Sequence, residues 1–369
     1  MHNLTNIPGW RTKRKIVIIE SDDWGSQRMP DREVYNVLLK EGYRVDTRPY
    51  ERYDSLASED DLSVLFDVLT SFNDKNGNHP IITANTIVAN PNFEKIKESD
   101  FQNYIYEPFT KTLQRYPNHI KSFDLWKEGM SLDIFHPQFH GREHFNILKW
   151  LELLRKKDKD TLCAFNHNMV GIPSKENPEK GNQLMVAYQL VTHKDILFQQ
   201  YSIEEGLRLF KEIFGYDSMS FIAPCYTWGE HIESTLSENG VKYIQGGRTQ
   251  QMPRLEKKVL LKRHYLGQKN RFNQIYLVRN CSFEPTLLGE KQLDTCLKEI
   301  EIAFKWHKPA IISSHRVNYI GNIDTRNRGG SIRLLNVLFK TLLNKWSDVE
   351  FLTSNQLGMS INNENRDSL

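Results

Sequence analysis

Short, continuous apolar runs recur along the chain, and polar residues follow each of them. The run KIVIIE at 15–20 is rich in β-branched residues, which is typical of a strand that is buried on both faces. The same pattern predicts a strand plus a loop in HPIITANTIV at 79–88. It predicts further strands in MSLDIF, TLCAF, MSFIAP, QIYLVRN and AIISSH, at 130–135, 161–165, 219–224, 274–280 and 310–315.

Helical periodicity occupies the segments between these runs. In 202–215, apolar residues recur at helical spacing, Ser202 and Glu205 form a potential capping box, and Gly215 is a stop signal. Other helices are expected at 31–41, 61–72, 143–157, 230–239, 290–306 and 331–346.

Strands and helices thus alternate over nearly the whole sequence. This order predicts parallel β/α units, and right-handed crossovers arrange such units as a barrel or as a doubly wound sheet. No linker composition interrupts the pattern, so we expect a single α/β domain over 1–369, with insertions at roughly 89–130 and 171–200.

Composition and charge exclude several classes of protein. With 49 Lys and Arg against 46 Asp and Glu, the net charge of +3 is too small for binding dominated by nucleic-acid phosphates. The four cysteines form no C-x-x-C pair, which excludes a zinc ribbon or a thioredoxin-type motif. The apolar runs are too short to cross a membrane and the start does not resemble a signal peptide, so a cytoplasmic protein without a transmembrane segment is expected.

Several predicted strands end in side chains that can bind a metal or transfer a proton. Functional residues of parallel β/α folds gather at such strand ends. Asp22 and Asp23 follow the first strand, His136, His140 and His144 follow the strand at 130–135, and His315 ends the strand at 310–315.

The Asp22–Asp23 pair has two interpretations. Most adjacent aspartates are solvated turns or helix caps, but these follow an apolar strand directly, which favours a functional site. Neighbouring residues point in different directions, so one carboxylate can bind a metal while the other takes a proton from water.

The histidines are more informative. His140 and His144 are four residues apart and can share one face of a helical turn, whereas Pro137 disfavours helical geometry at His136. Such a pair can also be structural. Together with a strand-end carboxylate, however, two imidazoles form an open zinc site that acidifies water and polarises a carbonyl. His315 is either a general acid with a pKa near neutrality or a buried histidine bonded to the backbone.

The ordered set SDDWG, HGREH, IAPCY and IISSH resembles the polysaccharide deacetylase family. That resemblance implies an irregular (β/α) barrel and removal of acetyl groups from glycans with a divalent metal. It implies Asp22 as the general base and His315 as the general acid. Asp23, His140 and His144 would be the metal ligands, with zinc as the favoured ion and cobalt, nickel or manganese as alternatives.

One motif departs from the family pattern. Its third motif is Arg-x-Pro followed by an aromatic residue; Pro224 and Tyr226 match, but Ile222 occupies the arginine position. The family arginine orients the catalytic aspartate, so either another cation replaces it or the mechanism differs. Arg142 and Arg316 are the candidates nearest to the motifs.

The remaining candidates lie on the substrate side. The oxyanion is expected on a backbone N–H near Tyr226, and His136 is a further candidate there. Trp24 and Trp228 stand beside the motifs and either stack on a sugar or pack in the core. Cys225 has no evident base as a partner.

The resulting function is a metal-dependent hydrolase in which metal-bound water attacks the acetyl carbonyl of an acetylated sugar or polysaccharide precursor. Hydrolysis of another C–N bond is one alternative, and a carbohydrate-binding protein that has lost catalysis is another. The expected partner is the acetylated carbohydrate, with no nucleic acid. The sequence leaves the sugar, its linkage and the oligomeric state open.

Overall fold

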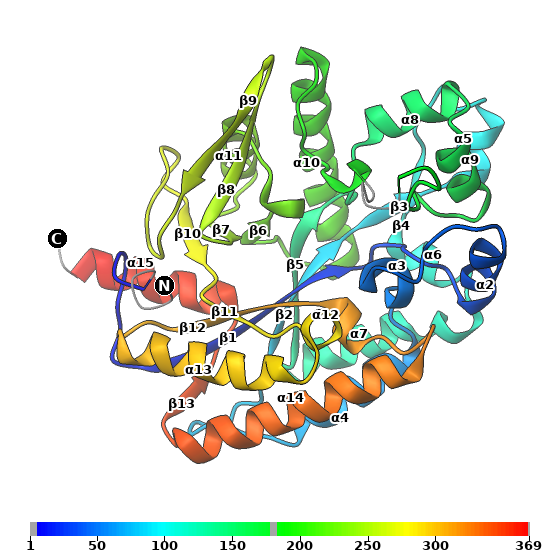
Figure 1. Ribbon diagram of the computed structural model, residues 1–369. Coiled ribbons are helices and arrows are strands. Elements are labelled where there is room, and N and C mark those ends of the chain that lie inside the picture. Colours follow the sequence, from blue (N-terminus) through cyan, green and yellow to red (C-terminus); the bar gives the residue numbers. More distant parts are fainter. Residues whose placement is uncertain (1–5, 178–182, 368–369) are drawn as a thin grey trace.

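The computed structural model describes residues 6–177 and 183–367, and a curved parallel sheet forms its centre (Figure 1). The strands follow the order β10-β7-β6-β5-β2-β1-β12-β11, and β13 pairs with β1 beside this path. Their bounds are β1 (Lys15–Trp24), β2 (Ile82–Ile87), β5 (Phe135–Gly141), β6 (Ser220–Ile222), β7 (Tyr243–Gly246), β10 (Ile275–Val278), β11 (Cys281–Ser282), β12 (Ala310–His315) and β13 (Val349–Phe351).

A broken strand joins the two edges of this sheet. β10 pairs with β7 and β11 pairs with β12, yet only Arg279 and Asn280 separate β10 from β11. The Arg279 N–H donates to the Gly246 carbonyl, and the Asn280 N–H donates to the Ile311 carbonyl. The sheet therefore closes into the predicted irregular (β/α) barrel.

The first strand is longer than its apolar run suggests. β1 continues through Trp24, so Asp22 and Asp23 lie within the strand instead of following it. The pairing of β1 with β2 shifts register between Ser21 and Trp24, and Asp23 has a φ of 73° in the left-handed region. A non-glycine residue adopts this conformation only where the surrounding structure enforces it.

The predicted helices occur with small changes in their bounds. The structure has α2 (Arg32–Lys40), α4 (Glu59–Thr70), α8 (Ile147–Arg155), α11 (Glu230–Glu238), α13 (Lys291–Lys305) and α14 (Thr325–Lys345). α10 (His193–Phe214) begins earlier than predicted, because Thr192 and Asp195 form the capping box in place of Ser202 and Glu205. Gly215 ends it in the left-handed conformation, as expected. α4, α13 and α14 pack together below the barrel in Figure 1.

Two predicted strands are wrong in all or most of their residues. The strand predicted at 130–135 falls on the end of α7 (Ser122–Ser131) and the following turn, while 161–165 lies in α9 (Lys159–Asn166). Short apolar runs do not distinguish a buried strand from a helix face, and the Asp158 side chain caps α9 by accepting from Thr161 N. β5 therefore consists of FHPQFHG and contains His136 and His140.

The predicted insertions add smaller elements around the barrel. The region 89–130 contains β3 (Ala89–Pro91), α5 (Phe93–Glu98), β4 (Tyr106–Pro108), α6 (Phe109–Leu113), η1 (Pro117–His119) and α7. The region 171–200 contains η3 (Gln183–Met185) and the first part of α10, and its residues 178–182 lie outside the described part of the chain. The other elements are α3 (Pro49–Tyr53), η4 (Pro224–Tyr226), β8 (Thr249–Arg254), β9 (Lys257–Arg263), α12 (Pro285–Leu288), η5 (Arg316–Tyr319) and α15 (Ser354–Asp367).

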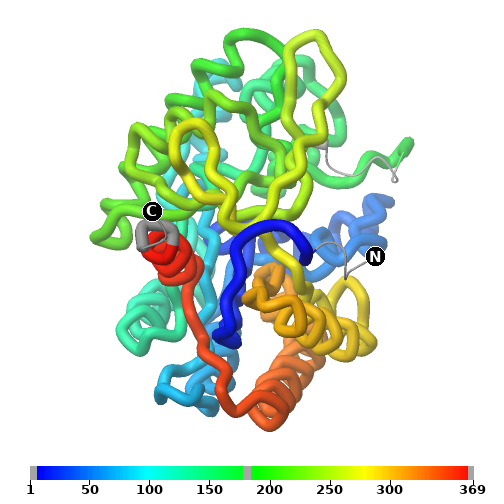
Figure 2. The backbone as a smooth tube through the Cα atoms, turned by 90° about the vertical axis from the view of Figure 1, so that its left-hand side faces the viewer, coloured from blue at the N-terminus to red at the C-terminus, as the bar shows by residue number. Residues whose placement is uncertain are grey.

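The two ends of the described chain meet. Figure 2 shows α15 beside the N-terminal segment, and the Trp10 indole N–H donates to Glu364 Oε2 at 2.9 Å. Within the described residues, no helix combines the length and the apolar character needed to span a bilayer.

Candidate active site

The carboxyl ends of the barrel strands surround a pocket of about 260 Å³. Five of its lining residues are those singled out in the sequence: Asp22, Asp23, His140, His144 and His315. β1, β5 and β12 carry four of them, and His144 lies in the loop after β5. Parallel topology therefore brings together side chains that are nearly 300 residues apart.

Asp23, His140 and His144 form one cluster of buried ligand atoms. Asp23 Oδ1 lies 3.5 Å from His140 Nε2 and 3.1 Å from His144 Nε2. The prediction that the two histidines share a helical turn is wrong: His140 is the last residue but one of β5, and His144 lies in the loop that follows Gly141, whose φ is 130°. The four-residue spacing of the two histidines therefore reflects a strand followed by a loop, not one turn of a helix.

The chemistry of this cluster fits a divalent metal. His140 Nδ1 lies 2.9 Å from the Ile222 carbonyl, an arrangement that assigns the proton to Nδ1 and leaves the lone pair on Nε2. Among the described residues, buried Asp23 Oδ1 and His140 Nε2 have no hydrogen-bond partner. Burial is the main cause that lowers the pKa of His144 to about 4, so its ring is neutral at pH 7. Convergent lone pairs on two imidazoles and one carboxylate make an open zinc-type ligand set.

Asp22 lies in a different environment, because Arg279 binds it with two nitrogens. Arg279 Nη2 donates to Asp22 Oδ1 at 2.6 Å and Nη1 donates to Oδ2 at 2.8 Å, while Asn85 Nδ2 donates to Oδ1 at 2.7 Å. Burial alone would raise the pKa of Asp22, but Arg279 and the nearby His315 outweigh it and lower the pKa to about 2. Asp22 is therefore a fixed carboxylate at neutral pH.

Arg279 supplies the cation that the third motif lacks. It lies at the junction of β10 and β11 and also donates from Nε to Glu20 Oε2 at 2.6 Å. Both arginines suggested by the sequence are wrong for this role: Arg142 pairs with Glu143 at 2.7 Å, and Arg316 pairs with Asp54 at 3.0 Å. The available signal was a charged residue at the end of the apolar run QIYLVRN.

His315 is held by a second acid that the sequence analysis missed. His315 Nδ1 lies 2.6 Å from Glu284 Oε1, and its Nε2 lies 3.8 Å from Asp22 Oδ2. Burial alone would lower the pKa of His315, but Glu284 and Asp22 raise it to about 10. His315 is therefore charged at neutral pH, with Nε2 directed toward Asp22. Glu284 follows β11 closely, so its place after a strand was a usable signal.

Of the residues predicted to contact the substrate, Tyr226 lines the pocket, whereas Trp24 and Trp228 are buried in the core. Tyr226 lines the pocket and its hydroxyl accepts from Arg279 Nη1 at 3.1 Å, but its backbone N–H donates to the Ala223 carbonyl at 3.0 Å. The Tyr226 N–H itself is therefore already occupied, and an oxyanion contact to another backbone N–H near Tyr226 stays a prediction. Trp24 and Trp228 are each 1% exposed, and their indole N–H groups bond Ser21 and Glu233. Both pack in the core, so sugar stacking on them is excluded.

His136 and Cys225 do not fit catalytic roles. His136 begins β5 whereas His140 is near its end, about 13 Å farther along the strand. The His136 ring stacks on Tyr216, and burial lowers its pKa to about 4. Cys225 reaches the pocket, but burial raises the pKa of its thiol to about 11, which disfavours a thiolate nucleophile.

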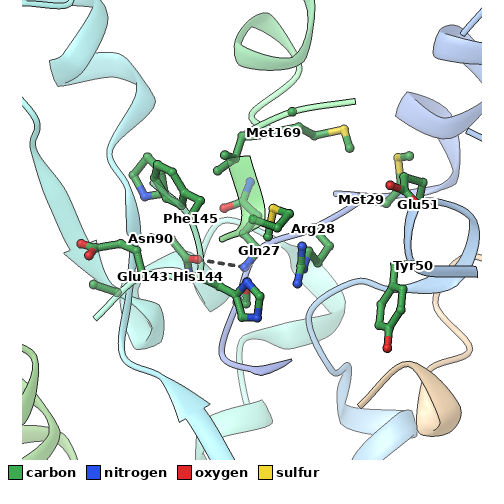
Figure 3. A pocket seen from close by; sticks show the side chains of 16 residues that line it. Gln27, Arg28, Met29, Tyr50, Glu51, Asn90, Glu143, His144, Phe145 and Met169 are labelled. Atoms are coloured by element: carbon green, nitrogen blue, oxygen red, sulfur yellow. Dashed lines mark hydrogen bonds between the residues drawn. The ribbon is translucent and has the colours of Figure 1, made fainter. Parts of the chain in front are cut away.

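Arg28 marks the boundary with a smaller, adjoining pocket of about 40 Å³. Figure 3 shows Arg28 between His144 and Tyr50, and its Nη2 lies 3.4 Å from Asp23 Oδ2. Burial alone would raise the pKa of Asp23, but His144 and Arg28 lower it well below its usual range. Met29, Phe145 and Met169 make the adjoining wall mainly apolar. No sequence motif had indicated Arg28.

Fold and pocket together define an irregular (β/α) barrel with acidic and imidazole groups at its strand ends. No protein-family profile matches the chain, and no curated protein matches its sequence. Solved structures do match. One from Mycobacterium smegmatis, named as a candidate polysaccharide deacetylase, has 11% identity and a TM-score of 0.50, covering 97% of this chain and 94% of that one. Another candidate polysaccharide deacetylase, from Pseudomonas aeruginosa PAO1, has 10% identity and a TM-score of 0.49, with 94% and 91% covered. The first likeness shows that the barrel is of the polysaccharide deacetylase type.

Proposed function

We propose that this protein is a metal-dependent hydrolase that removes acetyl groups from an acetylated sugar. The observation that carries the proposal is the division of one pocket into three convergent metal-ligand atoms, a paired carboxylate and a charged histidine. Deacetylation requires these three components: electrophilic activation, a base for water and an acid for the leaving group.

Each component has a named residue. Asp23, His140 and His144 would hold the metal, zinc being the favoured ion, and when bound it would polarise the acyl carbonyl and acidify water. Asp22 takes a proton from the attacking water, and Arg279 keeps that carboxylate ionised and oriented. His315 gives its Nε2 proton to the leaving amine or alcohol as the C–N or C–O bond breaks, and Glu284 keeps the ring charged beforehand.

The alternative of a carbohydrate-binding protein without catalysis fits this geometry less well. Sugar binding needs neither a carboxylate buried against arginine nor a histidine whose pKa is raised to about 10. Hydrolysis of a different C–N bond uses the same residues, and the chemical nature of the released product distinguishes it from deacetylation.

The first test is the metal content of the purified protein. We expect about one equivalent of metal per chain, as a single open site implies, and its loss in both His140→Ala and His144→Ala. His167→Ala is the matched control, because His167 belongs to a second, more exposed group with Glu41 and Cys163. The proposal is contradicted if the metal is lost in His167→Ala instead, or if the wild type holds no metal after supplementation.

The second test is acetate release from N-acetylated and O-acetylated sugars by the metal-loaded protein. We expect release that Asp22→Asn abolishes while the metal content is retained, because Asp22 contacts Arg279 rather than the metal-ligand atoms. Sugar binding without any acetate release would favour the non-catalytic alternative.

A further inference from the structure

A two-stranded ribbon projects from the same end of the barrel as the pocket. β8 and β9 pair antiparallel from Thr249 with Arg263 to Arg254 with Lys257, and Figure 1 shows the ribbon rising away from the sheet. Its base is bonded to the loop that contains Tyr226. Trp228 N–H donates to the Gln251 carbonyl at 3.2 Å, and Gln250 Nε2 donates to the Trp228 carbonyl at 2.7 Å. The ribbon is thus fixed to the pocket wall.

The ribbon concentrates positive charge. Residues 248–263 contain one acid, Glu256, and six bases: Arg248, Arg254, Lys257, Lys258, Lys262 and Arg263. Their net charge of +5 exceeds the +3 of the entire chain. Lys262 lies 3.7 Å from Glu230, on the neighbouring helix α11. A cationic patch of this density attracts an anionic partner.

Aliphatic side chains stand between these bases. Val259, Leu260 and Leu261 are consecutive on β9 and are 39%, 40% and 65% exposed. Consecutive strand residues point to opposite faces, so both faces of this part of the ribbon expose some apolar surface. An apolar run exposed in this way, with basic residues on both sides, marks an interaction surface.

We propose that the β8–β9 ribbon docks on the surface of an anionic lipid bilayer. The three aliphatic side chains would enter the boundary between headgroups and acyl chains, and the flanking lysines and arginines would reach the lipid phosphates. Juxtamembrane basic residues each add to such binding, and the gain disappears with distance from the surface or with salt.

Other occupants fit less well. A second copy that added its own β9 antiparallel at the free edge, centred on Leu260, would place Lys257 opposite Arg263 and Lys258 opposite Lys262. Like charges directly opposite each other destabilise strand pairing. Single-stranded nucleic acids are bound by aromatic platforms, whereas β9 presents only aliphatic side chains between its bases.

Docking would also narrow the class of substrate. Because the ribbon is bonded to the pocket wall, the bilayer surface would lie near the pocket entrance. Resting on the proposed deacetylase function, this placement favours an acetylated sugar that is carried on a lipid.

The experiment measures co-sedimentation with vesicles and needs no turnover. Vesicles of phosphatidylcholine alone are compared with vesicles containing about 30% phosphatidylglycerol, at low and high salt. We expect binding to the anionic vesicles only, weakened by salt and reduced at least about tenfold by Lys257→Glu/Lys258→Glu. Leu260→Ser/Leu261→Ser should reduce it as well, because both leucines would leave the acyl boundary.

Matched controls separate the ribbon from general surface effects. Lys95→Glu/Lys97→Glu makes the same charge change on α5, and Leu132→Ser removes a leucine that is 45% exposed in the turn before β5, at the opposite end of the barrel. Both controls should bind as the wild type does. Absent vesicle binding, or equal losses in the controls, overturns the proposal. So does a dimer in light scattering that Leu260→Ser/Leu261→Ser dissociates, because a second copy would then cover the ribbon.

Discussion

Asp22 and Asp23 are adjacent in the chain, yet they belong to two different halves of the pocket. Around Asp22, three donor nitrogens from Arg279 and Asn85 meet the two carboxylate oxygens. Around Asp23, Oδ1 faces the Nε2 atoms of His140 and His144, which could bind the same metal ion. The first half is balanced within the protein, whereas under the proposed function a bound cation would balance the second. The same proposal assigns proton transfer to the first half and metal binding to the second.

Backbone conformation produces this division. Asp22 continues the regular pairing of β1 with β12, where it lies opposite His315. Asp23 follows with a positive φ at the register shift, and its side chain turns toward β5 and the loop after it. An unstrained strand would alternate the two side chains between opposite faces of the sheet. The bulge lets both carboxylates reach one pocket.

Exchanging the two aspartates for asparagine gives the largest expected effects. Asp22→Asn removes the proposed base and should lower kcat by about 10²–10⁴-fold with metal content unchanged. Asp23→Asn removes a ligand charge and should lower both metal content and activity. Acetate release and elemental analysis of the same preparations measure the two quantities. Loss of metal in Asp22→Asn would contradict the division into halves.

Removing the cation from the Asp22 half should chiefly affect stability. Arg279→Met leaves buried Asp22 and Glu20 without their charged partner, and breaking a buried pair in this way costs about 3–5 kcal/mol. Arg14→Met is the matched control, because Arg14 pairs with Glu350 at a partly exposed site and should cost at most about 1 kcal/mol. Denaturant unfolding measures both values. Equal losses of unfolding free energy in the two variants would show that the buried pairs of Arg279 stabilise the fold no more than the partly exposed pair of Arg14 does.

Glu284→Gln should change the pH dependence more than the maximal rate. The pKa of His315 is raised to about 10, so the general acid remains charged from acidic pH up to that value. Without the Glu284 carboxylate, burial should lower the pKa of His315 from about 10, with only Asp22 and Asp23 still raising it, and activity should then decline at a lower pH than in the wild type. Rates measured between about pH 5 and pH 10 test this shift. If the activity of Glu284→Gln declines at the same alkaline pH as that of the wild type, His315 is not the general acid.

The sequence predicts the candidate catalytic and metal-binding residues better than the residues that hold them in place. Strand ends converge in any parallel barrel, so Asp22, Asp23, His140, His144 and His315 could be grouped before the structure was known. Arg279 and Glu284 could not be assigned, because their partners lie more than 250 and about 30 residues away and depend on how the barrel closes. A search near existing motifs instead selected Arg142 and Arg316, whose own acids are Glu143 and Asp54.

The prediction of secondary structure was wrong at two short apolar runs. The runs 130–135 and 161–165 contain too few residues to show a period, and tertiary packing made helices or turns of them. The tryptophans show a related limit, because proximity to a motif in the sequence does not indicate exposure. Trp24 contacts Trp126 and Phe135 in the core although it directly follows Asp23.

The smallest expected effect concerns the hydroxyl of Tyr226. This hydroxyl accepts from Arg279 Nη1 at 3.1 Å, while the same nitrogen also donates to Asp22 and to Ser313 Oγ. Tyr226→Phe therefore removes one of several contacts that orient Arg279, at a site where water can replace it. We expect kcat to fall only about threefold to fivefold, equivalent to about 1 kcal/mol, with metal content and the alkaline limb unchanged.

Tyr216→Phe is its control, since that hydroxyl donates to the Pro137 carbonyl at 2.9 Å, outside the residues that line the pocket. Loss of metal in Tyr226→Phe would mean that Tyr226 acts on both halves. A drop as large as that of Asp22→Asn would mean that the Asp22 half depends on the hydroxyl itself. A small drop confined to kcat would show instead that two nitrogens of Arg279 suffice to hold the base.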